Sequence, residues 1–197
     1  MLELVVAGND PDAARAVARE VGGVALIDDR ADVELAFHTL VRATTDDPDL
    51  LAPAAEVGTW VTYQRVMRAR AGVPSPDEAV VALFPMVRHP DLTHRQADDH
   101  WRHIHAPLAL ELHPGMSHYT QLSVVHTIHG FAYDGFALCG FESLQDCKTR
   151  FFAGPEGQQI IGDDVASFAD TRNSPRRLLT RSVSTRQVSD SQSPTGV

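Results

Sequence analysis

The sequence is poor in several features that would place it in a broad class. It has only 2 Cys, Cys139 and Cys147, which are too few for a disulfide framework or a zinc knuckle. Its 17 Lys and Arg stand against 26 Asp and Glu, a formal net charge of −9. This balance argues against a general nucleic-acid binder, because neutralising phosphates requires a surplus of basic residues. The sequence therefore predicts an acidic protein that does not bind nucleic acid.

Hydrophobic runs long enough for a membrane are also lacking. No apolar run reaches the roughly 18 residues typical of a membrane helix. Residues 1–6 contain neither the basic region nor the long apolar region of a secretory signal. We therefore expect a cytoplasmic protein without a membrane partner.

Motifs for common cofactors and nucleophiles are missing as well. The sequence contains no GxGxxG after a strand, no P-loop and no G-x-S-x-G elbow. His100, His103 and His105 have the spacing H-x2-H-x-H, but only the first two share a helical face, and no carboxylate at a characteristic spacing joins them. We therefore expect no metal site and no organic cofactor.

The 43% of apolar residues is sufficient for a folded core, and their pattern divides the chain into two similar units. In the first unit, Asp10 and Pro11 are typical of a helix start, and Gly22-Gly23 of a helix end. Alternation and turn residues then predict strand, helix, strand, strand, helix, strand over 2–7, 11–21, 24–27, 33–43, 48–55 and 60–63.

The second unit repeats this order at larger size after a linker at residues 73–78. Thr93 and Gln96 form a capping-box pattern at the start of a helix, and Pro107 is expected to kink that helix or divide it. A tail rich in Ser and Gln, residues 187–197, is predicted to be disordered. The remaining elements are predicted at 80–88, 93–112, 117–128, 133–141, 143–152, 158–168 and 178–183.

This pattern predicts an α+β fold made of tandem ferredoxin-like β-α-β-β-α-β units, residues 1–72 and 79–186. Each unit would form a four-stranded antiparallel sheet with helices on one face, which leaves the other face bare. Two such sheets can cover each other, within one chain or between two chains. Either arrangement predicts a cavity between the sheets.

The second unit contains a motif that carries a family resemblance. Trp101 is followed by His105-Ala106-Pro107-Leu108, and Pro114-Gly115 precedes Tyr119. In these residues the chain resembles the EthD family of the dimeric α+β barrel superfamily, over about residues 79–185. The resemblance implies a homodimer that binds small organic molecules in a cleft. Related proteins include polyketide cyclases, a muconolactone isomerase and quinol monooxygenases that use no cofactor.

His105 is the leading candidate for catalysis among the 10 His, nine of which lie between His89 and His129. Helical spacing places it on the inward arc with Trp101 and Ile104, whereas His100 and His103 should face solvent. Imidazole titrates near neutral pH, so His105 could act as an acid and a base. The alternative is a buried histidine that bonds a backbone carbonyl.

The strand at 117–128 offers two faces. His126 lies with Leu122 on one face, and Tyr119 lies with Gln121 on the other; the sequence leaves open which face lines the cavity. Tyr119 could donate a hydrogen bond to a substrate oxygen, or could be a packed tyrosine with its hydroxyl satisfied. His126 has the same two alternatives.

These observations predict an enzyme without an organic cofactor that moves protons on an apolar, aromatic or polyketide-like molecule, as a cyclase, isomerase, dehydratase or lyase. His105 would be the acid and base, with Tyr119 or His126 stabilising an enolate oxygen. The alternatives are a cofactor-free or haem-assisted oxidoreductase and a non-catalytic binding protein.

Five further residues are expected to bind the substrate. Asp164 could orient His105 or cap a helix, and Arg88 could pair with an anionic group or form a surface ion pair. The expected substrate-binding residues are Trp101, Arg88, Gln121, Phe136 and Asp164.

Overall fold

The structure, a computed structural model, describes residues 1–71 and 79–184. The predicted linker at 73–78 and the predicted tail at 187–197 lie outside the described residues. The first half of the chain contains β1 (Leu2–Gly8), α1 (Pro11–Glu20), β2 (Val24–Ile27), β3 (Thr39–Ala43), the 3-10 helix η1 (Pro48–Ala54) and β4 (Gly58–Arg68).

The second half contains four strands and a larger set of helices. A long helical stretch follows β5 and consists of three consecutive segments, α2, η2 and α3. The elements are β5 (Val80–Met86), α2 (His94–His100), the π-helix η2 (Trp101–His105), α3 (Ala106–Leu112), β6 (Met116–His129), β7 (Gly135–Phe141), α4 (Leu144–Thr149), α5 (Gly154–Phe168) and β8 (Leu178–Ser184).

The eight strands form one closed barrel in the order β1-β3-β2-β8-β5-β7-β6-β4. Each half contributes four strands, and its first strand lies between its third and its fourth. All neighbouring strands are antiparallel, and the halves join through β2 with β8 and through β4 with β6. The chain is therefore an α+β barrel that closes within one polypeptide, one of the two arrangements that the sequence allowed.

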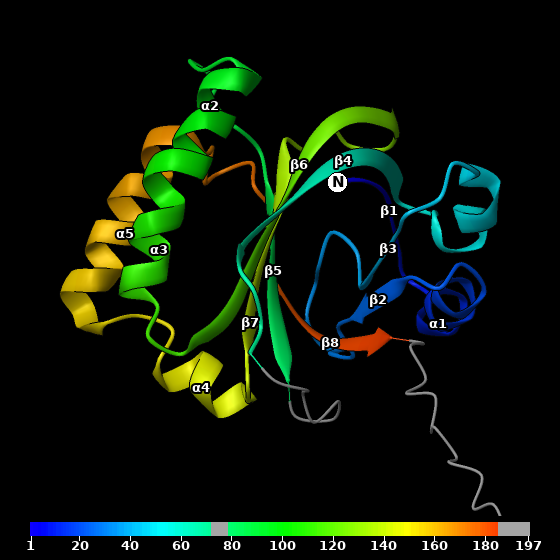
Figure 1. Ribbon diagram of the computed structural model, residues 1–197, viewed down its shortest axis with the longest axis horizontal. Coiled ribbons are helices and arrows are strands. Elements are labelled where there is room, and N and C mark those ends of the chain that lie inside the picture. The colour runs from blue at the N-terminus through cyan, green and yellow to red at the C-terminus, as the bar shows by residue number, and fades with distance from the viewer. Residues whose placement is uncertain (72–78, 185–197) are drawn as a thin grey trace, which may run out of the picture.

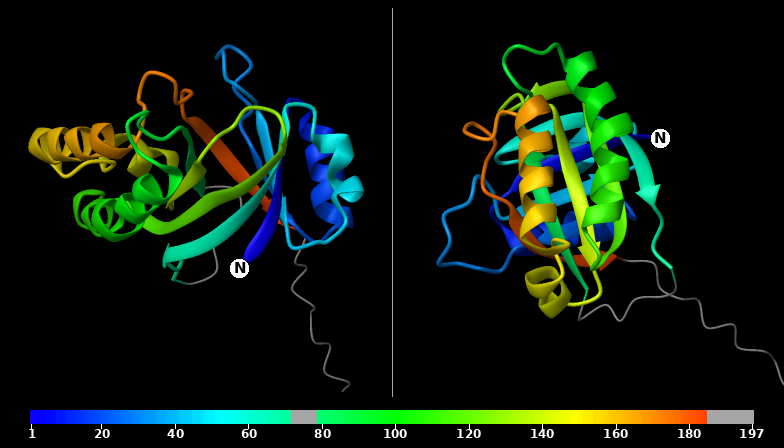
Figure 2. Two further views of the ribbon diagram at one scale, coloured as in Figure 1. Left: turned by 90° about the horizontal axis from the view of Figure 1, so that it is seen from above. Right: turned by 90° about the vertical axis from the view of Figure 1, so that its left-hand side faces the viewer.

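Helices cover the outside of the barrel on two opposite sides (Figure 1). The helix α1 and the 3-10 helix η1 pack on the first half through short aliphatic side chains, including Ala14, Val17 and Leu51. On the second half, α3 and α5 lie side by side across the outer face of the sheet (Figure 2). None of the helices in residues 1–71 and 79–184 is long and apolar enough to cross a membrane.

The barrel interior is filled with side chains, which corrects the expectation of a cavity between the two sheets. Trp60 and Phe136 are fully buried there, with ring centroids 5.2 Å apart. Phe37 joins them at 6.4 Å from Phe136. Such close aromatic packing leaves the interior as core, and any binding site has to lie elsewhere.

Local signals in the sequence set several element boundaries. The Asp10 carboxylate accepts hydrogen bonds from the amides of Asp12 and Ala13, and Gly22 follows the helix with a φ of 63°. The predicted strand at 33–43 is wrong in its first half, since β3 begins only at Thr39. The preceding residues leave the sheet because Phe37 turns into the barrel core.

Candidate functional site

The helix that carries Trp101 and His105 contains a π-turn immediately before Pro107. The amide of Ala106 donates to the carbonyl of Trp101, five residues earlier. Proline has no N–H and clashes with the preceding turn of a regular helix, so a locally wider turn keeps the helix continuous. The expectation that Pro107 would kink or divide the helix is thus met by a change of helix type rather than by a break.

The π-turn changes which side chains face inward. Trp101 and His105 are buried as predicted, and His103 is exposed as predicted. Ile104 was expected on the inward arc, but its side chain is 54% exposed. The extra residue in the turn rotates the helix face relative to the regular spacing of 3.6 residues.

Asp164 on α5 holds two histidines of the neighbouring helix. Its Oδ2 lies 2.7 Å from Nδ1 of His105, and its Oδ1 lies 2.8 Å from Nε2 of His100. The orienting role considered for Asp164 is therefore the contact observed. The prediction that His100 faces solvent is wrong, because the bond to Asp164 draws its ring against Phe168 and leaves the side chain 22% exposed.

The Asp164 contact fixes the proton position on His105. Burial acts to raise the pKa of Asp164, but the hydrogen bonds from His105 and His100 outweigh it and hold that pKa below its ordinary value. An ionised carboxylate only accepts hydrogen bonds, so Nδ1 of His105 carries the proton. The neutral ring then has its lone pair on Nε2, which makes no hydrogen bond to any residue in 1–71 or 79–184.

A cavity of about 720 Å³ lies between these helices and the outer face of the second-half sheet. His105 and Trp101 form part of its wall, and the other side chains are mostly apolar. The volume and character suit a small organic ligand. The walls come from β5, β7, the helices and the segment before β8, and they include Phe84, Met86, Cys139, Phe151, Phe152, Ile161, Val165, Phe168 and Arg177.

His113 is a second histidine in the cavity wall, and the sequence analysis missed it. Its Nδ1 bonds the carbonyl of Phe151, and a carbonyl only accepts, so Nδ1 carries the proton and Nε2 the lone pair. Burial lowers the pKa of His113 to about 4, so the ring is neutral at pH 7. A single histidine after a helix end carries no signal in the sequence that would have distinguished it.

Tyr119 and Gln121 lie on the helix-facing side of β6, below the π-turn. The Tyr119 hydroxyl accepts hydrogen bonds from Nε1 of Trp101 at 2.9 Å and from Nε2 of Gln121 at 3.1 Å. Gln121 also donates to the Trp101 carbonyl at 3.0 Å. Neither residue is part of the cavity wall, and burial raises the pKa of Tyr119 above its ordinary value. Both therefore support Trp101 from below, which matches the packed-tyrosine alternative.

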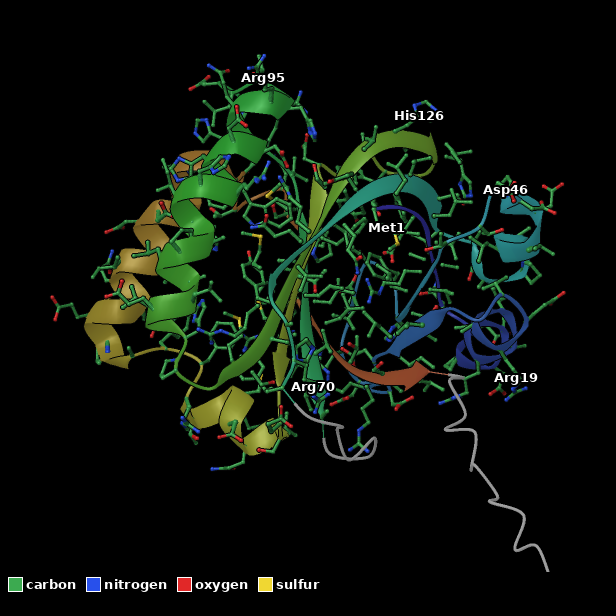
Figure 3. The ribbon with its side chains drawn as sticks, in the orientation of Figure 1. Met1, Arg19, Asp46, Arg70, Arg95 and His126 are labelled. Atoms are coloured by element: carbon green, nitrogen blue, oxygen red, sulfur yellow. The ribbon has the colours of Figure 1, made fainter. Side chains whose placement is uncertain are left out.

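The three remaining predicted site residues are not brought into the cavity. Arg88 forms an ion pair with Asp134 at 2.9 Å, and Phe136 belongs to the barrel core. His126 is exposed near the far end of β6, on the side of the molecule away from α3 and α5 (Figure 3). These positions do not support the roles expected of Arg88, Phe136 and His126.

The described residues offer little for metal or thiol chemistry. In residues 1–71 and 79–184 there is no group of three or more His, Cys, Asp or Glu side chains that could hold a metal ion. Cys139 lines the cavity, but burial raises the pKa of its thiol to about 12. A protonated, buried thiol is a poor nucleophile.

Solved structures with the same fold carry different descriptions. The structure of an anthrone oxidase-like protein has a TM-score of 0.56 and 11% identity, covering 94% of this chain and 93% of that one. A candidate monooxygenase of Lactobacillus acidophilus NCFM has a TM-score of 0.54 and 7% identity, covering 92% of each chain. A major regulator of staphylococcal pathogenesis has a TM-score of 0.52 and 10% identity, covering 91% and 98%. At these identities the likeness concerns the fold alone.

The sequence comparisons match a shorter part of the chain than the structural comparisons. No protein of curated function matches the chain. The family described as EthD domain matches residues 89–172, which contain the π-turn, His105 and Asp164 and lie within the region of the predicted resemblance. The resemblance to the EthD family that the sequence predicted is therefore confirmed over residues 89–172, which are less than half of the chain.

Proposed function

We propose that the chain is a small-molecule enzyme in which His105 moves a proton on an apolar substrate bound between the helices and the second-half sheet. The observation that carries this proposal is the pairing of His105 with Asp164 in the wall of a largely apolar cavity. An ionisable side chain that is oriented by a carboxylate and faces an apolar pocket is a frequent arrangement for a general acid and base.

The chemistry follows from the position of the two ring nitrogens. Asp164 keeps the proton on Nδ1, so Nε2 can accept a proton from a substrate carbon or hydroxyl. The imidazolium that forms is stabilised by the adjacent carboxylate, and Nε2 can return the proton to another atom of the substrate. A base of this kind serves enolisation and hence isomerisation, cyclisation or elimination, and it needs no organic cofactor.

Proton abstraction can be measured without knowing the natural substrate. Anthrone is an aromatic ketone with an acidic methylene group, and anaerobic incubation with the protein in D2O would report exchange by mass spectrometry. We expect His105→Gln to slow this exchange about 10²–10⁴-fold, the usual contribution of a general base. His103→Gln changes an exposed histidine of the same helix and should have no effect. Unchanged exchange by folded His105→Gln protein would refute the assignment.

Oxidation is a second candidate, favoured by the descriptions of two neighbours as an anthrone oxidase-like protein and a candidate monooxygenase. The same base would form the substrate anion, and O2 would then accept its electrons. For anthrone, one O2 gives anthraquinone and one water. Oxygen uptake with anthraquinone formation that is lost in His105→Gln would support oxidation. Hydrogen–deuterium exchange of anthrone without oxygen uptake would support proton transfer alone. A Soret band in the purified protein would indicate haem assistance.

Two further proposals concern the units of the fold and the oligomeric state. We interpret each half as a ferredoxin-like unit, because both halves have the order strand, helix, strand, strand, helix, strand and the same strand neighbours. The second helix of the first unit is the 3-10 helix η1, so that unit is the more degenerate one. The EthD resemblance also favours a homodimer of this single-chain barrel.

A further inference from the structure

The charge of the cavity wall differs from that of the whole protein. The chain has a formal net charge of −9, yet among residues 1–71 and 79–184 no Asp and no Glu lines the cavity. They include one arginine, Arg177, in the segment just before β8. An acidic protein that keeps carboxylates out of a pocket and places a guanidinium in its wall has a pocket suited to an anion.

Arg177 has no charged partner within the part of the chain that the structure describes. It makes no ion pair or hydrogen bond to any residue in 1–71 or 79–184. Its guanidinium carbon lies 5.2 Å from the centre of the Phe151 ring and 5.9 Å from that of Phe84. The two aromatic rings hold the planar group in place without using its hydrogen-bond donors.

His113 lies beside Arg177 in the cavity wall. Its ring centre lies 4.6 Å from that of Phe151, the ring that Arg177 covers. His105 lies against a different ring, Phe168, at 5.1 Å. The helix α3 separates His105 from His113 in the sequence. The cation and the proton-transfer group therefore contact different aromatic rings of the cavity wall.

We infer that the ligand of this cavity is an apolar molecule bearing an anionic oxygen group, such as a carboxylate, which Arg177 binds while the reacting carbon lies near His105. The inference rests on the proposed function, since it assigns the substrate class of the same site. A guanidinium with free donors matches a carboxylate in a two-point hydrogen bond. The neutral His113 offers Nε2 as an acceptor for a substrate hydroxyl beside it.

No other arginine in residues 1–71 and 79–184 lines this cavity. Arg88, which the sequence suggested for an anionic group, is already neutralised by Asp134. Arg176 is exposed like its neighbour Arg177, but it is not part of the cavity wall. Arg176 therefore provides a matched control for the loss of one positive charge at the same place in the chain.

Two fluorescent probes that differ by one charge test the inference. 8-Anilinonaphthalene-1-sulfonate is an anion, and N-phenyl-1-naphthylamine is the same ring system without the sulfonate. We expect Arg177→Gln to weaken binding of the anionic probe about tenfold, equivalent to about 1.4 kcal/mol, and to change binding of the neutral probe by less than about twofold. Arg176→Gln should leave both affinities unchanged, and raising the salt concentration should weaken only the anionic probe.

The other outcomes separate this inference from the proposed function. If Arg177→Gln weakened the binding of both probes equally, or of neither, the assignment of an anion site would be overturned. The result of the His105 exchange assay would not be affected by that outcome. Failure of both probes to bind the unmodified protein would overturn the cavity as a ligand site, and the proposed function with it. His103→Gln should bind both probes normally, because His103 is exposed and is not part of the cavity wall.

Discussion

The two halves of the barrel have the same order of strands but differ in what lies beneath their helices. In the first half, Ala14, Val17 and Ala18 of α1 pack against Val6 and Ile27 of the sheet. The cavity-lining residues within 1–71 and 79–184 all lie between Phe84 and Arg177, in the second half. The candidate site therefore lies beneath the helices of the second half.

Side-chain size differs between the two helix layers in the same way. The buried helix residues of the first layer are Ala, Val and Leu. The cavity wall of the second layer contains the bulky side chains Phe84, Trp101, Phe151 and Phe168. A π-turn, a carboxylate and two histidines occur in the second layer. The candidate site is thus concentrated in the layer with the larger side chains.

The largest effect that would separate the two halves is expected from Asp164→Asn. An amide can donate as well as accept, so the proton of His105 can shift to Nε2 and the lone pair facing the cavity is lost. We expect anthrone exchange to slow at least about a hundredfold, with a changed pH profile and unchanged probe binding. The measurement is the exchange rate in D2O between pD 5 and 9.

Asp163→Asn is the matched control for that experiment. Asp163 neighbours Asp164 on α5, but within residues 1–71 and 79–184 its side chain bonds only Gln159, at 2.7 Å. The variant should exchange anthrone at the normal rate. If Asp164→Asn were fully active, Asp164 would be a structural link between two helices and the second layer would lose its catalytic distinction.

The second largest effect is expected on the free energy of unfolding at low pH, and it depends on His113. Its pKa is lowered from 6.5 to about 4 by burial, so between these pH values the unfolded chain binds a proton that the folded chain does not. The free energy of unfolding should therefore fall as pH drops through this window, by on the order of 3 kcal/mol at most. In His113→Gln this slope should flatten, as measured by urea unfolding at pH 7.5, 6.0 and 4.5.

Two other groups of the molecule should behave differently from His113. The hydrogen bond to Asp134 raises the pKa of His94, so His94 stabilises the folded state at low pH and its contribution is lost as pH rises. Burial acts to raise the pKa of Asp28, but its bonds to Arg30 and to the Leu179 amide lower it, so its contribution is lost only as pH falls below 3.8. A steeper acid loss in His113→Gln than in the unmodified protein would contradict the assignment.

Regular helical spacing predicted some residues of the candidate site correctly. It failed for side chains whose positions depend on an irregular helix or on a partner far away in the sequence. The motif around Trp101 and the four-residue spacing to His105 predicted an inward histidine, and Asp164 was named as its possible partner. The inward Ile104 was wrong because the π-turn inserts a residue that regular spacing cannot anticipate. The solvated His100 was wrong because Asp164, far along the sequence, bonds its ring. Local periodicity therefore predicts a helix face only while the helix stays regular.

The prediction of the fold also succeeded for local features and failed for features that depend on distant contacts. The order of elements and the capping residues Asp10 and Thr93 are local, and the structure confirms them. The filling of the barrel by Trp60 and Phe136, and with it the position of the cavity outside the barrel, depends on contacts across the whole chain. Arg177 illustrates the limit, since its role depends on Phe84 and Phe151, which lie far from it in sequence.

The smallest effects compare the room available in the two helix layers directly. Ala18 is fully buried in the first layer, so Ala18→Leu should overpack it and lower the free energy of unfolding by about 1–3 kcal/mol. Gly162 lies within α5 at the cavity, and a Cβ added there would have no neighbour within 4 Å. Gly162→Leu should therefore raise the free energy of unfolding, by up to about 1 kcal/mol from helix propensity alone.

In these two variants, the affinity for the probe should not follow the stability of the protein. A leucine at position 162 adds an apolar side chain to the cavity wall, so N-phenyl-1-naphthylamine should bind less tightly although the protein is more stable. Ala18→Leu should leave probe binding unchanged although the protein is less stable, because α1 lies on the opposite side of the barrel (Figure 1). Urea unfolding and probe titration of both variants would check this. A first layer that accepts the extra side chain without loss would show that close packing does not distinguish the two halves.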